Sequence, residues 1–275
     1  LLGNEEKIKE IITQNNIDLE GVTIINPRKE ESKLDAFADI FFAKRQRRGY
    51  NLYEARKQMQ ERNYYGAMMV ETGEADALIS GLTRKYSDTI KPSLQIIRTQ
   101  PGVKKVAGMY IMITKKGPVF LADTTINLNP TADDLVEITL ITAQALQKMN
   151  FKPRIALLSY SNFGSTEEGG PRVVREAVAK LHREYPDLCA DGEIQGNFAV
   201  NKQMLKDNFP FSKFVDEGAN VLIFPNLEAG NITYKLLQEL GGAEAIGPVL
   251  LGMNKPVHIV QLGSSVRELV NMVTI

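Results

Sequence analysis

Short apolar runs alternate along the chain with longer stretches in which apolar residues recur at helical spacing. The apolar runs predict strands at 22–25, 103–114, 118–123, 154–159, 221–224, 249–251 and 257–261, with a further strand end at 75–80. Helical spacing and capping residues predict helices at 32–48, 51–62, 87–98, 129–150, 176–184, from 225 to 240, and from 265 onward. This alternation predicts an α/β protein whose mostly parallel sheets carry helices on both faces.

The composition is that of an ordinary globular protein, with 43% hydrophobic and 24% charged residues among 275. Lys+Arg and Asp+Glu are balanced at 33 each, which argues against a nucleic-acid or membrane-surface partner and makes any anion site local. The single cysteine, Cys189, excludes an internal disulfide and favours a reducing compartment, so we expect a cytoplasmic location. His182, His258 and Cys189 have no metal-ligand spacing, and we expect no metal in this chain.

The segment from Asn254 to Asn271 carries the strongest motif of the chain. It reads N-K-P-V-H-I-V-Q-L-G-S-S-V-R-E-L-V-N. It resembles, without a gap, the closing motif of the phosphate acetyl/butyryltransferase family, N-K-P-V-N-D-L-S-R-G-C-S-V-E-D-I-V-N. Other similar segments occur in the same order along nearly the whole chain, at 65–70, 75–81, 92–97, 101–103, 129–132, 158–165, 191–195 and 224–231.

The resemblance implies two three-layer αβα domains with a cleft between them. The first domain would comprise residues 1–101 and 250–275, and the second would be an insertion at 102–249. The family also implies at least a homodimer. Composition alone shows no linker or boundary.

The resemblance also implies a chemistry, the transfer of an acyl group between coenzyme A and phosphate. Such a reaction needs a base for the thiol, a donor for the developing oxyanion, and cations for the phosphate. The family uses an adjacent Ser-Arg pair, a nearby Asp and two separate arginines. These positions correspond here to Gln261, Leu262 and Glu268, and to Arg45 and Lys91.

Because the altered residues gather at the reacting positions, the sequence predicts that the catalytic set is not intact. The ligand-binding residues that we expect nonetheless are Arg45, Arg84, Lys91, Ser161, Asn162, Phe163, Gly164 and Ser165. Small polar residues after a buried strand can present backbone N–H groups to a phosphate, but they can equally form an ordinary turn. Glu268 could equally be an ordinary surface residue.

The departures suggest a similarity to the C-terminal phosphotransacetylase-like domain of multidomain NADP-dependent malic enzymes. That likeness implies a regulatory domain without transferase activity, which binds acetyl-CoA or CoA as an allosteric inhibitor. The abrupt start at Leu1-Leu2-Gly3 agrees with a piece of a longer chain. The dinucleotide-binding motif G-x-G-x-x-G is not present. NADP and a divalent metal would therefore belong to an upstream malate dehydrogenase (oxaloacetate-decarboxylating) domain.

Two alternatives remain open at this stage. One is an active phosphate acetyltransferase in which Glu268 serves as the base and Gln261 as the oxyanion donor. The other is a structural oligomerisation module that binds no ligand.

Overall fold

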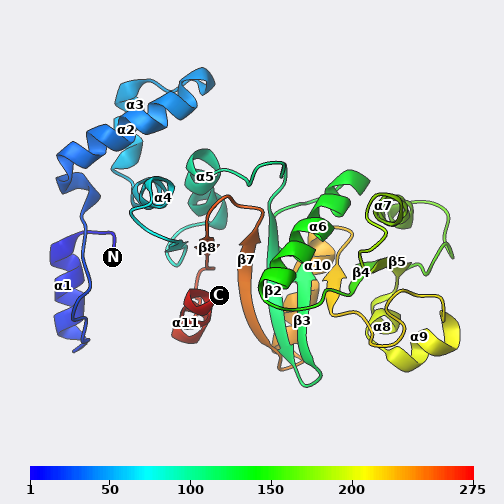
Figure 1. Ribbon diagram of the computed structural model, residues 1–275. Coiled ribbons are helices and arrows are strands. Elements are labelled where there is room, and N and C mark those ends of the chain that lie inside the picture. The colour runs from blue at the N-terminus through cyan, green and yellow to red at the C-terminus, as the bar shows by residue number, and fades with distance from the viewer. The chain divides into compact units, whose positions relative to one another are not determined.

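The computed structural model describes all residues from 1 to 275 and has the mixed α/β fold that the sequence predicts (Figure 1). The chain divides into two compact units. The first unit contains residues 1–98 and 254–262, and the second contains residues 99–253 and 263–275. None of the helices is both long and apolar enough to cross a membrane.

The first unit is mostly helical and has a pair of short parallel strands. Its helices are α1 (Glu5–Gln14), α2 (Glu31–Arg45), α3 (Leu52–Met59), α4 (Arg62–Thr72) and α5 (Tyr86–Ile96), with short 3-10 turns η1 (Pro27–Lys29) and η2 (Gln46–Arg48). Strands β1 (Leu78–Ser80) and β8 (Val257–Ile259) pair in parallel, with Leu78 opposite Val257. The side chains of Phe41, Tyr65 and Met68 are completely buried and form the core of this unit.

The second unit is built on six strands in the order β7-β2-β3-β6-β4-β5. The strands are β2 (Ala107–Thr114), β3 (Gly117–Ala122), β4 (Ile155–Leu158), β5 (Ala190–Ile194), β6 (Val221–Ile223) and β7 (Glu244–Leu251). The predicted hairpin is confirmed, since β2 and β3 pair antiparallel across the Lys115-Lys116 turn. The pair β2–β7 is also antiparallel, whereas β3–β6, β4–β6 and β4–β5 are parallel.

Helices cover both faces of this sheet, with α6 on one face and α10 on the other (Figure 1). The helices of the unit are α6 (Ala132–Lys148), α7 (Gly170–Glu184), α8 (Gly196–Ala199), α9 (Lys202–Asn208), α10 (Leu227–Glu239) and α11 (Val266–Thr274). Helix α6 begins at a capping box, in which the Thr131 hydroxyl and the Asp134 carboxylate each accept the other's backbone N–H. Apolar residues at intervals of three and four then bury Leu135, Ile138 and Leu146 against the strands.

Several elements differ from the sequence prediction. The predicted strand at 22–25 is wrong, because only Ile25 forms an isolated bridge, to Leu2, while Val22 remains 42% exposed. The predicted helix at 51–62 is two helices, α3 and α4, since the first ends at Met59. Strand β5 was not predicted, because its sequence Ala-Asp-Gly-Glu-Ile is too polar for an ordinary buried strand.

The C-terminal helix α11 belongs with the second unit in the structure. The guanidinium of Arg267 pairs with the carboxylate of Glu244 on β7 at 2.7 Å, and the Asn271 amide donates to the same carboxylate at 3.0 Å. The division at residues 102 and 250 stays a proposal, and these contacts favour assigning α11 to the second domain.

Candidate functional site

The predicted phosphate-binding cations all lie in the first unit. Arg45 is the last residue of α2, is half-buried, and has a buried Nε atom without a hydrogen-bond partner. Arg84 follows β1 and pairs with the carboxylate of Glu61 at 2.7 Å. Lys91 is exposed on α5. Of the three cations, only Arg84 has an acidic partner.

The altered motif positions follow strand β8. Gln261 is partly buried, and Leu262 is 63% exposed. The backbone before them is held against β1, because the N–H of Val260 donates to the Ser80 carbonyl at 2.9 Å. Gly81 is required beside this bond, since its φ is +135° and a Cβ there would lie 2.0 Å from the Val260 carbonyl oxygen.

Glu268 has a structural role in the second unit. Its carboxylate accepts the backbone N–H of Ser265 at 2.6 Å, and the Ser265 hydroxyl accepts the N–H of Glu268 at 3.2 Å. This reciprocal pair is the capping box of α11. One carboxylate oxygen is therefore engaged in the helix cap.

The loop that follows β4 uses its own backbone N–H groups internally. Every N–H from 161 to 166 has an acceptor among residues 159–165 or on Glu193. For example, Asn162 donates to the Ser165 hydroxyl at 3.0 Å, and Gly164 donates to the Glu193 carboxylate at 2.9 Å. In this structure the arrangement favours an ordinary, tightly bonded turn over a ring of free N–H groups for a phosphate.

A buried carboxylate holds this loop from beneath. Glu193 on β5 has no exposed surface and accepts the hydroxyl of Ser161 at 2.8 Å. Arg175 on α7 donates to both of its oxygens, at 3.1 and 3.0 Å. Burial alone would raise the pKa of Glu193, but the bonds from Arg175, Gly164 and Ser161 outweigh it and leave this pKa below its ordinary value. The loop is therefore fixed by a carboxylate that stays ionised.

Phe163 packs among other aromatic side chains. Its ring centroid lies 5.0 Å from that of Phe209 and 4.9 Å from that of Phe211. The positive φ of Phe163, 45°, turns the chain at this point. Phe211 is 66% exposed, so this cluster leaves an aromatic surface accessible.

Sequence reasoning missed the residues that organise the second unit, above all Asp123. Its buried carboxylate, just after β3, accepts N–H groups of Gly108, Thr125 and Asn127 at 2.9, 2.8 and 2.7 Å. Glu193 lies in the segment 191–195, which resembles the family, but the sequence assigned it no role. The signal for Asp123 was an acidic residue at the end of an apolar run, where burial demands hydrogen-bond partners. Glu193 had no such signal, because its segment Ala-Asp-Gly-Glu-Ile is polar.

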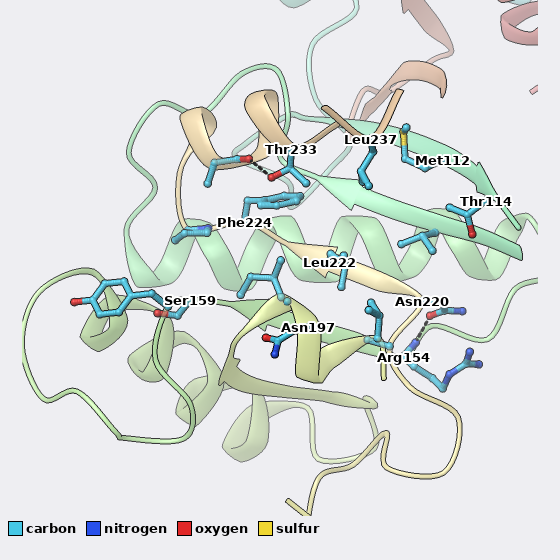
Figure 2. Close-up of a pocket in the computed structure, with 18 of the residues that line it drawn as sticks. Met112, Thr114, Arg154, Ser159, Asn197, Asn220, Leu222, Phe224, Thr233 and Leu237 are labelled. Carbon is cyan, nitrogen blue, oxygen red and sulfur yellow. Dashed lines mark hydrogen bonds between the residues drawn. The ribbon is translucent and has the colours of Figure 1, made fainter. Parts of the chain in front are cut away.

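A hollow of about 1030 Å³ in the second unit lies over the sheet face that carries α10 (Figure 2). Its apolar lining includes Met112, Leu222, Phe224 and Leu237 of α10. Its polar lining residues include Arg154, Ser159, Asn197 and Asn220. In the loop after β4, only Ser159 and Tyr160 line this hollow. The predicted ligand-binding residues 161–165 do not line it.

No group of three or more His, Cys, Asp or Glu side chains is placed to hold a metal ion. The unpaired cations of the first unit and the apolar hollow of the second are typical of an α/β protein that binds phosphorylated organic ligands.

Comparison with known proteins gives the family. The sequence profile of the phosphate acetyl/butaryl transferases matches residues 1–275. The phosphate acetyltransferase of Corynebacterium glutamicum is 39% identical over all of this chain and 83% of its own length, and that of Bacillus subtilis is 37% identical over 100% and 84%. The chain therefore belongs to the phosphate acetyl/butyryl transferase family.

Solved structures agree. The phosphotransacetylase of Streptococcus pyogenes has a TM-score of 0.88 at 35% identity and is matched over 99% of this chain and 82% of that one. The EutD phosphotransacetylase of Staphylococcus aureus has a TM-score of 0.87, also at 35% identity, over 98% and 82%.

These findings correct the main functional prediction. Relatives that match the whole chain are phosphate acetyltransferases in their own right, which contradicts an inactive regulatory domain. They show no link to malic enzyme, and they support neither NADP nor an upstream oxidoreductase domain. The prediction gave a few altered positions, Lys91, Gln261, Leu262 and Glu268, more weight than the similarity along the rest of the chain.

Proposed function

We propose that this protein transfers an acyl group between coenzyme A and phosphate. The observation that carries the proposal is similarity over the entire chain to phosphate acetyltransferases, in sequence and in fold. The substrates would be an acyl-CoA and inorganic phosphate, or acyl phosphate and CoA in the reverse direction. We propose a cytoplasmic location, in keeping with the single free cysteine.

The chemistry assigns roles to residues that differ from the family motif. As the thiolate attacks the acyl carbonyl, negative charge develops on oxygen, and a side-chain N–H can stabilise it. The carboxamide of Gln261 offers such a donor, where the family has a hydroxyl. Arg45, Arg84 and Lys91 would neutralise the phosphate, although Lys91 supplies only a point charge where an arginine would supply a fork.

A base must accept the thiol proton. Glu268 matches the position of the family's aspartate, and one of its two carboxylate oxygens is engaged in the α11 cap. The other oxygen would take the proton in this proposal.

The test is direct. The purified chain is mixed with acetyl phosphate and CoA, and formation of the thioester is followed by its absorbance. We expect turnover that is saturable in both substrates and is absent after heat denaturation. A rate no greater than that of the uncatalysed mixture, with a folded protein shown by circular dichroism, would refute the proposal. Butyryl phosphate in place of acetyl phosphate then tests acyl-chain preference.

A further inference from the structure

Two adjoining hollows in the first unit are bordered by an excess of positive charge. Their volumes are about 610 and about 470 Å³, and they share Arg28, Gln60 and Glu61 as lining residues. The cationic side chains along the two hollows are Lys7, Arg28, Arg48, Lys57, Arg62 and Arg84. They come from α1, η1, η2, α3, α4 and the segment after β1, so folding gathers them from distant parts of the sequence.

The acidic residues of the two hollows are already engaged. Glu54 accepts the N–H of Asn51 at 3.0 Å in the capping box of α3. Glu61 pairs with Arg84 at 2.7 Å. Glu54 and Glu61 are the only acidic residues that line these hollows, so two carboxylates face six cations there.

Five cations therefore remain without an acidic partner. Lys7, Arg28, Arg48, Lys57 and Arg62 take part in none of the ion pairs of the structure. The chain as a whole is balanced, with 33 basic and 33 acidic residues, so this excess of cations is local. Like charges that face one hollow repel each other, and a bound anion relieves that repulsion.

We infer that this basic surface binds an organic polyphosphate. Several separated cations require a ligand with several negative charges, and arginine forks match phosphate oxygens in pairs. Apart from Gly49 and Tyr50, the residues that line the larger hollow are charged or carry an amide, which suits a charged ligand more than an acyl chain.

Two sources share this chemistry, the phosphorylated nucleotide end of coenzyme A and a free nucleoside triphosphate. The inference goes beyond the proposed function, because the basic surface would bind phosphates whether or not the chain transfers acyl groups. Binding and turnover are therefore measured separately.

The experiment is calorimetric titration of the full chain with pyrophosphate, ATP and CoA at low ionic strength. The test variant combines Arg28→Ala with Arg48→Ala. Its matched control is Arg47→Ala, because Arg47 is the neighbour of Arg48 in η2 but does not line either hollow. We expect the double variant to weaken the tightest of the three ligands about tenfold or more, and the control to change it less than about twofold.

Each outcome of the titration either supports the inference or overturns it. Tighter binding of CoA than of ATP identifies the nucleotide end of CoA as the ligand, and the reverse order identifies a free nucleotide; both support the inference. Equal affinity in the double variant and the wild type overturns it, as does the absence of binding by all three ligands. The wild type could bind one of these ligands, lose that binding in the double variant, and still show no transferase activity. That result would support this inference and refute only the proposed function.

Discussion

The guanidinium of Arg175 contacts both carboxylate oxygens of Glu193, through Nε at 3.1 Å and Nη2 at 3.0 Å. Glu193 is fully buried, whereas the Arg175 side chain is 37% exposed, so the arginine closes the outer side of a buried anion. The same carboxylate accepts hydrogen bonds from the Ser161 hydroxyl and the Gly164 N–H. Arg175 also donates a hydrogen bond to the Thr166 carbonyl. One ion pair thus ties α7 and β5 to the loop after β4.

This geometry predicts that Glu193→Gln destabilises the protein by about 1–3 kcal/mol, since the amide keeps the size but presents N–H groups to donors. Urea unfolding measures the loss. The matched control is Glu176→Gln on the same helix as Arg175, because Glu176 is exposed and forms a surface pair with Arg172 at 3.0 Å. That control should cost less than about 0.5 kcal/mol. Equal losses in the two variants would contradict the anchoring role.

The same carboxylate predicts an acid-dependent loss of stability. The pKa of Glu193 is lowered in the folded protein, so the folded state binds fewer protons here than the unfolded chain does. The stabilisation is complete above the unfolded pKa of about 4.3 and disappears as the pH falls through the lowered folded value. Unfolding midpoints between pH 7 and pH 3 should therefore fall less steeply in Glu193→Gln than in the wild type. Parallel curves would show that Glu193 does not contribute.

A second titration involves His258 on β8. Burial lowers its pKa, and its Nδ1 atom is buried without a hydrogen-bond partner. Because the folded state favours the neutral ring, stability is fully present above the unfolded pKa of about 6.5 and is lost as the pH falls below it. We expect His258→Leu to flatten the pH dependence between pH 7 and pH 5, measured by urea unfolding. His182→Leu is the control at an exposed position, and a similar flattening there would argue against the assignment.

The sequence could predict the α/β class, the β2–β3 hairpin and the capped start of α6, because these depend on local patterns of apolar, turn and capping residues. It could not predict β5. Asp191 and Glu193 are tolerated inside this strand only because Lys213, Gly164 and Arg175, all distant in sequence, supply donors. Such long-range compensation leaves no periodic signal.

The loop after β4 shows the same limit at the candidate site. Its residues 161–165 look suited to a phosphate because they are small and polar, yet their N–H groups are used within the fold. Conversely, Arg28 and Lys57 appear in the sequence as isolated surface cations. Only folding shows that they border one hollow. Residue type indicated the chemistry, but only the fold showed which groups remain available.

The proposed reaction predicts a role for Gln261 that its exposed neighbour does not share. If its amide stabilises the oxyanion, Gln261→Ala should lower kcat with acetyl phosphate and CoA by about 10²–10³-fold, with a smaller change in KM. Leu262→Ala serves as the control, since Leu262 is 63% exposed and its side chain has no hydrogen-bonding group; its rate should stay within about threefold of wild type. Comparable rates for Gln261→Ala and wild type would remove Gln261 from the mechanism.

Gly230 on α10 allows the helix to approach the Asp123 turn. A Cβ at this position would lie 2.3 Å from the Asp123 carbonyl oxygen and 3.2 Å from the Phe224 ring, so Gly230→Ala forces the backbone apart. We expect a destabilisation of about 1–3 kcal/mol in urea unfolding. Gly170→Ala, at the first residue of α7, meets nothing within 4 Å and should change stability by less than about 1 kcal/mol in either direction.

Because the Asp123 carboxylate organises the turn after β3, displacement of α10 in Gly230→Ala should also increase amide exchange at Thr125 and Asn127. Unchanged exchange at both residues, together with wild-type stability, would show that α10 can shift without disturbing this turn.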